Sequence, residues 1–457
     1  MAAVLPRYVR IGGGCVKEIG SVLKQVRCER PLIITDPYLA GCGLVDRVKG
    51  LMVGTVDGVG VYSATIPDPT SDSIRDLAAF LGSAEGTGYD SLVAVGGGSP
   101  MDTAKGALAL VERGGVMRDY NSPTLTDAPF ATPLVCVPTT AGTGSETTRF
   151  TAVTCSETGE KMRVVGDAFV PVAAICDWEL TMGAPPGLTA DTGVDALCHA
   201  MEAHVGARKR GTRTYLRRER FAIVCFEESI QSSRPEREMS TRPRTSRSEW
   251  KLTEGGASKK ITGFPAQAYV SSRRNAFADG AAIDALRSIG RHIHGAYANE
   301  PEGREGMMYG SFAAGIAFSS SSVTLVHGMS RPLGAHFHIA HGRSNAVIAP
   351  HLTAFSVAGD AARYDVVRDA LGFAGDLPAA LAKLNADLNI PSLYDTLVDL
   401  GYDEAQYHEA IPTMASEALA SGSPSYNPVL ADQGQIETLY AEIYAQGKDA
   451  AKARVAA

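Results

Sequence analysis

Short apolar runs alternate with helical patterns along the first 185 residues, and this alternation limits the possible folds more strongly than any other feature. Four runs are apolar almost throughout and predict buried strands at residues 31–36, 91–96, 133–137 and 173–177. Helical patterns separate them, for example at 71–81 and 101–112. Buried strands that alternate with helices are typical of a parallel sheet covered on both faces. We therefore predict an N-terminal α/β domain over residues 1–184.

The pattern changes after Pro185-Pro186, where helical patterns replace the strand-like runs. Alanine-rich helical patterns follow at 277–297, 307–319 and 377–388. We predict an all-helical second domain over residues 185–457. A chain of 457 residues has room for both domains, because one domain takes roughly 150 residues. The hydrophobic content of 45% excludes a wholly disordered chain.

One segment of the second domain, residues 204–268, differs in composition from the rest. Between His204 and Gln267 there are 15 lysines and arginines but 7 acidic residues, a local charge of +8, which leaves −15 for the remainder of a chain with net charge −7. Residues 231–249 are polar, interrupted by proline and without periodicity, which is typical of disorder. Such charge asymmetry indicates a nucleic-acid arm, a site for an acidic partner or a foreign segment.

Cysteine usage and hydropathy indicate where the protein works. The eight cysteines are scattered without a Cys-x-x-Cys pair, which is typical of buried thiols in a reducing compartment. Residues 1–10 lack the pattern of a secretory signal, and no stretch of about 18 apolar residues predicts a membrane span. We expect a cytoplasmic protein that does not enter a membrane.

Two loops rich in glycine or threonine follow predicted strands. Gly96-Gly-Gly-Ser-Pro-Met-Asp102 precedes a helical pattern, with Ser99 suited to the helix N-cap and Pro100 to the first helical position. The exposed N–H groups of such a helix start suit a pyrophosphate. Pro138-Thr-Thr-Ala-Gly-Thr-Gly-Ser-Glu146 offers hydroxyl donors after the next strand. Either loop alone is compatible with an ordinary turn, but two at neighbouring strand ends favour a ligand site.

Asp36 ends an earlier strand and has two interpretations. A carboxylate at this place in a nucleotide-binding sheet accepts hydrogen bonds from a ribose 2′-hydroxyl and repels a 2′-phosphate. Alternatively, Asp36 is an ordinary loop residue before Pro37. Taken alone, the residue favours the second interpretation.

One aspartate and several histidines of the second domain form a candidate metal site. Asp195 and His199 are four residues apart, so a helix presents both on one face, although such a pair is more often a surface contact. His327 and His341 complete a set of one carboxylate and three imidazoles, which suits Fe(II) or Zn(II) better than Mg or Ca. His336 and His338 are alternative candidates for the same role.

Four motifs occur in an order and at separations that match a known family. They are Gly-Gly-Gly-Ser-Pro-x-Asp from Gly96, Pro-Thr-Thr-Ala-Gly-Thr-Gly-Ser-Glu from Pro138, Gly-Val-Asp-Ala-Leu-x-His-Ala-x-Glu from Gly193, and His-Gly-Met…His-Gly from His327. The chain closely resembles the iron-containing (group III) alcohol dehydrogenases of the dehydroquinate synthase-like superfamily. The resemblance runs from about residue 7 to residue 444, apart from the basic segment.

The resemblance implies a Rossmann-like nucleotide-binding domain, a helical metal-binding domain and a site between them. It implies a metal-dependent, NAD(P)-linked oxidoreductase that interconverts an alcohol and its aldehyde or ketone by hydride transfer, and a homodimer. By resemblance, the metal ligands are Asp195, His199, His327 and His341, holding Fe(II) or Zn(II). The nucleotide residues carried over are Asp36, Gly97, Gly98, Ser99, Asp102, Thr139, Thr140, Thr143 and Lys161. Asp36 matches the position that signals NAD rather than NADP.

The chain departs from the family pattern at Arg331 and at the basic segment. Many relatives carry a histidine proposed to shuttle protons at the position of Arg331, and an arginine stays protonated near neutral pH. The sequence therefore assigns no catalytic proton carrier. Joining Ala203 to Tyr269 would restore the family's phrase, so we interpret residues 204–268 as a translated retained intron or a gene-model error. Sequencing the transcript across codons 203 to 269 tests this interpretation.

Other functions are compatible with the same residues. A related superfamily enzyme, such as glycerol dehydrogenase, maleylacetate reductase or dehydroquinate synthase, is the second hypothesis. A binding protein inactivated by the segment is the third. Nucleic-acid binding by the segment is disfavoured, because it has no fold signature for RNA or DNA binding.

Overall fold

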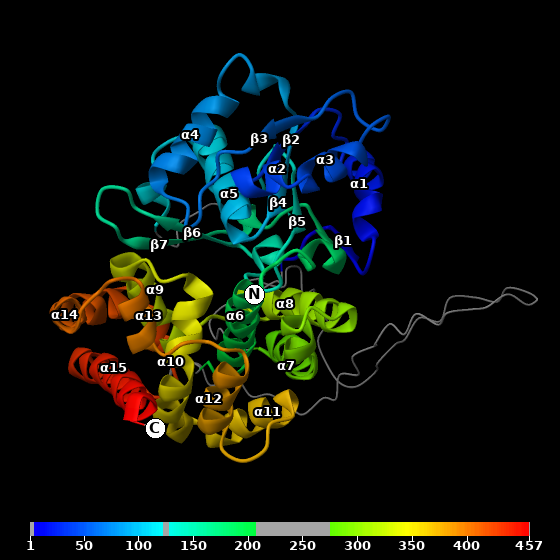
Figure 1. The fold of residues 1–457 in the computed structure, drawn as a ribbon. Helices are drawn as coiled ribbons and strands as arrows, with labels where there is room; N and C mark the ends of the chain where they lie inside the picture. Colours follow the sequence, from blue (N-terminus) through cyan, green and yellow to red (C-terminus); the bar gives the residue numbers. More distant parts are fainter. Residues whose placement is uncertain (1–3, 122–127, 207–274, 457) are drawn as a thin grey trace, which may run out of the picture.

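A computed structural model describes residues 4–121, 128–206 and 275–456. It has two parts: a sheet with its helices, and a cluster of helices beside it (Figure 1). The sheet contains β1 (Tyr8–Ile11), β2 (Pro31–Ile34), β3 (Gly60–Tyr62), β4 (Ser91–Gly96), β5 (Leu134–Pro138) and β8 (Ala173–Cys176). These strands are all parallel, in the order β1-β8-β5-β4-β2-β3. The predicted parallel sheet is confirmed.

Alternate residues of the central strand β4 face two separate cores. Leu92 and Ala94 belong to a core with residues of α4 (Ser71–Leu81) and α5 (Gly98–Arg113). Val93 and Val95 belong to a core with residues of α1 (Ile19–Gln25) and α3 (Leu44–Gly50), next to the short α2 (Pro37–Gly41). Because both faces are buried, the strand is apolar throughout rather than alternating.

The second part is helical, as predicted, and no strand follows β8 in the described residues. Its helix α6 (Pro186–Val205) runs through the largest apolar core and packs against α7, α8 and α10. The remaining helices are α7 (Ala276–Tyr297), α8 (Pro301–Ser320), α9 (Leu325–Phe337), α10 (His341–Ser356), α11 (Ala361–Leu371), α12 (Leu377–Asp387), α13 (Leu393–Asp399), α14 (Glu404–Ala420) and α15 (Gln433–Ala456). The boundary predicted after residue 184 falls in the connection between β8 and α6. In the described ranges no single helix is long and apolar enough to cross a membrane. Helices α8 and α9 reach that length and hydropathy only when they are taken as a pair, and the pair is bent by 103°.

Two local predictions differ from the structure. The antiparallel hairpin of β6 (Phe150–Thr154) and β7 (Lys161–Val165) was not predicted, because its residues alternate in burial and form no apolar run. The predicted N-cap at Ser99 is wrong. Helix α5 begins at Gly98, with Gly97 as its N-cap and no side chain capping it. The glycines therefore leave the first N–H groups of α5 without a side-chain cap.

Most of the basic segment, residues 207–268, and the disorder predicted for 231–249 lie outside the described residues. The first residues of the predicted segment, His204 and Val205, belong to α6 and are buried. The helices on either side of the segment, α6 and α7, both contact Arg363 of α11. Arg363 donates from Nε to the His204 carbonyl at 2.7 Å and from Nη2 to the Asp279 carboxylate, and His204 Nδ1 lies 3.6 Å from Asp279 Oδ1.

Deleting residues 204–268 and joining Ala203 to Tyr269 is expected to leave a folded protein. The replacement places Tyr269 at the position of His204, whose backbone carbonyl accepts a hydrogen bond from Arg363 of α11, and a valine, Val270, at the position of buried Val205. We expect a melting temperature within a few degrees of the full chain's and unchanged metal content, measured by calorimetry and by elemental analysis. An insoluble deletion variant would contradict the interpretation of the segment as foreign.

Candidate metal centre

Three buried polar side chains lie along one face of helix α6. Asp195, His199 and Glu202 are spaced by four and three residues, so they lie along one face of the helix. Their residues are 2%, 5% and 1% exposed, respectively. Buried carboxylates and imidazoles in such number need partners or a cation, because unpaired charge in the interior is costly. This face of α6 is therefore the base of a site.

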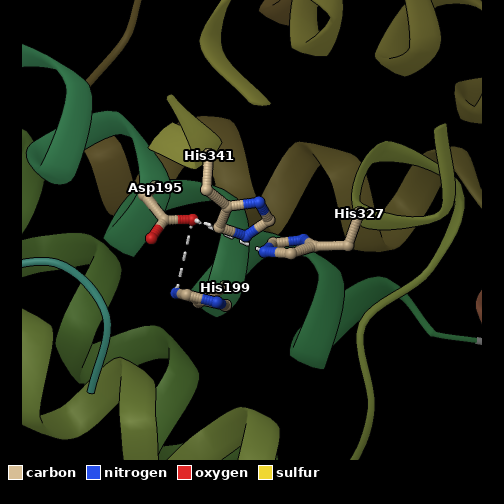
Figure 2. Close-up of side chains that lie close together, drawn as sticks. All are labelled: Asp195, His199, His327 and His341. Carbon is tan, nitrogen blue, oxygen red and sulfur yellow. Dashed lines mark ion pairs between the residues drawn. The ribbon is translucent and has the colours of Figure 1, made fainter. Parts of the chain in front are cut away.

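The other two predicted ligands come from α9 and α10, far along the chain. His327 lies in the first turn of α9, and His341 is the first residue of α10. Asp195 Oδ1 lies 3.8 Å from His199 Nδ1, 3.5 Å from His327 Nε2 and 3.8 Å from His341 Nε2. Figure 2 shows the four side chains converging. One candidate ligand atom from each residue lies within 4.8 Å of the others.

The two alternative histidines lie away from this cluster. His336 Nε2 is 3.0 Å from Glu417 Oε2 of α14. His338 is exposed and ends α9 in a left-handed conformation, with φ 56°. Among the described residues the structure brings together Asp195, His199, His327 and His341, and it leaves His336 and His338 outside.

Glu202 orients His327, a role that the sequence analysis missed. The His327 Nδ1 contacts Glu202 Oε2, so the opposite nitrogen, Nε2, faces Asp195. Glu202 Oε1 accepts hydrogen bonds from Thr324 Oγ1 at 2.6 Å and from the Val326 N–H at 2.7 Å. Metal-binding histidines commonly use a carboxylate in this way to fix the ring and its tautomer. The signal was available, because Glu202 lies seven residues after Asp195 on the same helix face.

Two further neighbours of the cluster, Asn345 and Phe318, were not predicted from the sequence. Asn345, one turn after His341, places Nδ2 2.7 Å from Asp195 Oδ1 and 3.2 Å from His327 Nε2. The ring of Phe318, on α8, stacks on His199 with centroids 4.0 Å apart. The aromatic ring covers one face of the imidazole and keeps water from it. No sequence signal distinguishes Phe318 from an ordinary core residue.

Burial and mutual charge set the protonation of the cluster. Desolvation lowers the pKa of His199 to about 3 and that of His341 to about 4. Desolvation opposes ionisation of Asp195, but the surrounding imidazoles hold the pKa of its carboxyl below its ordinary value. Near neutral pH the cluster therefore offers a carboxylate and at least two neutral imidazoles, the forms that bind metals.

These residues fit a divalent transition metal. The buried Nδ1 of His199 has no hydrogen-bond partner in the described part of the chain. Buried polar atoms normally have a partner, so this nitrogen marks a position where a cation would satisfy it. Three imidazoles with one carboxylate suit Fe(II) or Zn(II), while Mg and Ca prefer oxygen ligands.

The two predicted nucleotide loops lie against each other at the carboxyl ends of β4 and β5. A Cβ atom added to Gly97 would lie 3.2 Å from Thr140 Oγ1, and one added to Gly98 would lie 3.0 Å from Thr143 Cγ2. Ser99 is partly exposed beside them, and Thr139 is 7% exposed. Glycine at 97 and 98 thus permits a close approach of the two loops.

The other predicted nucleotide residues already have protein partners. Asp36 caps α2, accepting a hydrogen bond from the Leu39 N–H at 2.8 Å. Asp102 accepts hydrogen bonds from Ser145 Oγ at 2.7 Å and from the Ala152 N–H at 3.0 Å. Lys161 Nζ lies 2.7 Å from Asp68 Oδ1. Their roles toward a nucleotide stay predictions.

Glu146, in the threonine-rich loop, is buried, and desolvation raises the pKa of its carboxyl to about 7. The titratable groups near it are Lys105, Cys136 and Cys176. The native state therefore keeps a proton that the unfolded chain releases near pH 4.5. The contribution of Glu146 to the free energy of unfolding is expected to fall as pH rises from about 4.5 to about 7. Above that range the contribution stays at its lower value.

Glu146→Gln is therefore expected to stabilise the protein by about 2–3 kcal/mol at pH 8 and by much less at pH 5. Urea unfolding at the two pH values measures the difference. Glu157→Gln, at an exposed position of the β6–β7 turn, is the matched control and should change neither value. An equal effect of Glu146→Gln at both pH values would contradict the raised pKa.

Two family models match the chain, one in the sheet domain and one in the helical part. The model "iron-containing alcohol dehydrogenase" matches residues 6–178, and the model "Fe-containing alcohol dehydrogenase family, C-terminal" matches residues 266–444. Together the matches cover more than half of the chain. The chain belongs to the iron-containing alcohol dehydrogenase family. Most of the basic segment falls in the gap between the two matches.

Individual members of the family resemble the chain over nearly its whole length. The NAD-dependent methanol dehydrogenase of Bacillus methanolicus is 30% identical, with 93% of this chain and 95% of that protein covered. The lactaldehyde reductase of Escherichia coli K12 is 28% identical, with 96% and 98% covered. A solved structure of a 1,3-propanediol oxidoreductase superposes with a TM-score of 0.76 at 26% identity, covering 97% of this chain and 99% of that one.

Proposed function

We propose that this iron-type alcohol dehydrogenase interconverts an alcohol and its aldehyde or ketone, with NAD as hydride carrier. The observation that carries the proposal is the buried set of Asp195, His199, His327 and His341, whose ligand atoms lie within 4.8 Å of one another. The glycine and threonine loops at the neighbouring sheet edge support it, because parallel sheets bind nucleotides there. Methanol, long-chain alcohols and lactaldehyde appear in the names of relatives, which supports an alcohol or aldehyde substrate.

The chemistry divides between the bound groups and the chain. Fe(II) or Zn(II) in the four-residue set supplies a Lewis acid for the substrate oxygen, and NAD supplies the hydride acceptor. The chain's own contribution is to hold and orient. Glu202 fixes the His327 ring, and Phe318 keeps water from one face of His199. The N–H groups at the start of α5 bind the pyrophosphate, and Thr139, Thr140 and Thr143 border the nicotinamide end.

Asp36 and Arg331 have separate roles in this proposal. The Asp36 carboxylate accepts from the ribose 2′-hydroxyl and so favours NAD over NADP. Arg331, one turn after His327, donates from Nη1 to Ser423 Oγ at 2.9 Å. Its guanidinium stays charged at neutral pH and does not accept the alcohol proton. Proton release therefore uses a group other than residue 331.

The test combines metal analysis with a screen of substrates. The purified full chain is analysed for bound iron and zinc. NADH consumption is followed over aldehydes and ketones, and NADH formation from NAD over alcohols and hydroxy acids. We expect turnover that chelation abolishes and that added Fe(II) or Zn(II) restores. Turnover that survives complete removal of the metal would contradict the proposed chemistry. Selective turnover of a glycerol or maleylacetate substrate would favour the related enzymes instead.

We also propose a homodimer in the cytoplasm. In the described residues β1 pairs only with β8, and the other edge of β1 carries no strand. Such an open edge is suited to pairing with another chain. The seven cysteines of the described residues are all free thiols, which fits a reducing compartment. Analytical ultracentrifugation tests the dimer, and a monomer at micromolar concentration would contradict it.

A further inference from the structure

Lys105 is buried completely in α5 and has no part in the metal set. Its Nζ lies within hydrogen-bond distance of the carbonyl oxygens of Ser145 at 2.6 Å, Thr148 at 3.0 Å and Phe150 at 3.0 Å. It also donates to Ser145 Oγ at 2.9 Å. An ammonium group has three N–H donors, so these four acceptors share them and use its whole capacity. Lys105 therefore binds one short segment, residues 145–150, from several directions.

This segment, which we call the bridge segment, contacts the helical part on its other side. The Arg149 N–H donates to Ser319 Oγ of α8 at 3.3 Å. The Phe150 ring stacks on Phe318 with centroids 5.5 Å apart. Just before the segment, Gly144 lies so close to Gly315 of α8 that a Cβ on Gly144 would come within 2.7 Å of the Gly315 Cα. The bridge segment thus joins the sheet domain to α8.

Both ends of this connection lead to the functional site. Helix α5, which carries Lys105, begins at the glycine loop, and the bridge segment begins with the last two residues of the threonine loop, Ser145 and Glu146. Phe318, which contacts Phe150, also stacks on His199 of the metal set, with centroids 4.0 Å apart. Contacts therefore run from Lys105 through Phe150 and Phe318 to a candidate ligand.

We propose that Lys105 is a positioning residue that fixes the nicotinamide end of the nucleotide relative to the metal ligands. The inference rests on the proposed hydride transfer. Such a transfer depends steeply on geometry, since a misplacement of 1 Å can cost on the order of 100-fold in rate. Lys105 touches neither substrate nor metal in this proposal, and it acts through the bridge segment.

Lys105→Met tests the proposal, because methionine is also unbranched but cannot donate. We expect metal content and NADH affinity close to those of the unchanged enzyme, with kcat about 100-fold lower. The primary isotope effect with an alcohol deuterated at the carbinol carbon should rise, since hydride transfer becomes the slow step. Lys105→Arg keeps the charge and the donors and should recover part of kcat. Unchanged kcat, or metal and NADH binding lost together with kcat, would overturn the proposal.

A second measurement does not depend on turnover. Co(II) loaded into the metal set quenches the fluorescence of bound NADH in a distance-dependent manner. At saturating NADH we expect weaker quenching in Lys105→Met than in the unchanged protein, and equal quenching would overturn the positioning role. If quenching differs between the two proteins but the unchanged protein turns over no substrate, the proposed function is contradicted and the positioning role is not.

Ser145→Ala keeps the proposal testable if Lys105→Met does not fold. The substitution removes a hydroxyl that contacts both Lys105 and Asp102 and leaves the three carbonyl contacts in place. We expect kcat to fall about tenfold, the kinetic equivalent of one hydrogen bond, with the same rise in isotope effect. An unchanged kcat and isotope effect in this variant would overturn the proposal.

Discussion

Asp195→Ala is expected to remove bound metal and turnover together. Asp195 is the carboxylate of the set, and its Oδ1 is the atom that all three imidazoles face. Without it the site keeps only neutral donors and loses the charge that balances a divalent cation. Losing a Lewis acid that supplies several kcal/mol corresponds to a fall in kcat on the order of 10³-fold. Elemental analysis and NADH-linked assays on the same preparation measure both effects.

His336→Ala is the matched control for this variant. His336 lies on α9, the helix of His327, but its imidazole contacts Glu417 instead of the cluster. We expect its metal content and turnover to stay close to those of the unchanged enzyme. A normal metal content in Asp195→Ala, or metal loss in His336→Ala, would show that the ligand set has been assigned incorrectly.

Glu202→Gln is expected to weaken metal binding by about 10- to 100-fold. The amide is nearly isosteric with the carboxylate but loses the negative charge beside His327 Nδ1. Desolvation works against ionisation of Glu202, yet its contact with His327 keeps the pKa of Glu202 below its ordinary value. The carboxylate is therefore the form that orients His327. Competition with a chelator at fixed pH measures the metal affinity.

Helix α14 offers a control for Glu202→Gln. Glu417 pairs with His336 as Glu202 pairs with His327, but outside the cluster. Glu417→Gln removes a carboxylate–imidazole contact of the same kind and should leave metal affinity unchanged. Equal metal affinities for Glu202→Gln and the unchanged enzyme would mean that Glu202 serves the fold rather than the metal.

Several elements of the fold follow from local pattern. The strands at β2, β4, β5 and β8 were predicted because strands buried on both faces are apolar throughout. The β6–β7 hairpin was missed because its burial alternates and its residues are mixed. The start of α5 was misplaced by the preference of serine for N-caps, whereas a glycine, Gly97, occupies that position.

Some residues of the candidate site could also be predicted from local pattern, and others could not. The pair Asp195 and His199 follows from helical spacing, which depends only on neighbouring residues. Glu202 could have been found by extending that spacing one turn further. Lys105 could not, because nothing near it in the sequence distinguishes a buried lysine from an exposed one, and its partners lie about 40 residues away.

Local chemistry alone therefore established the element types, the family motifs and the residue types that suit a transition metal. Only the packing of α6 against α9 and α10 decided which histidines meet Asp195, since α6 ends more than 100 residues before α9 begins. Contacts over such separations depend on how helix faces pack, and no local periodicity records that. For this reason His327 and His341 join the set, while His336 and His338, a few residues away, do not.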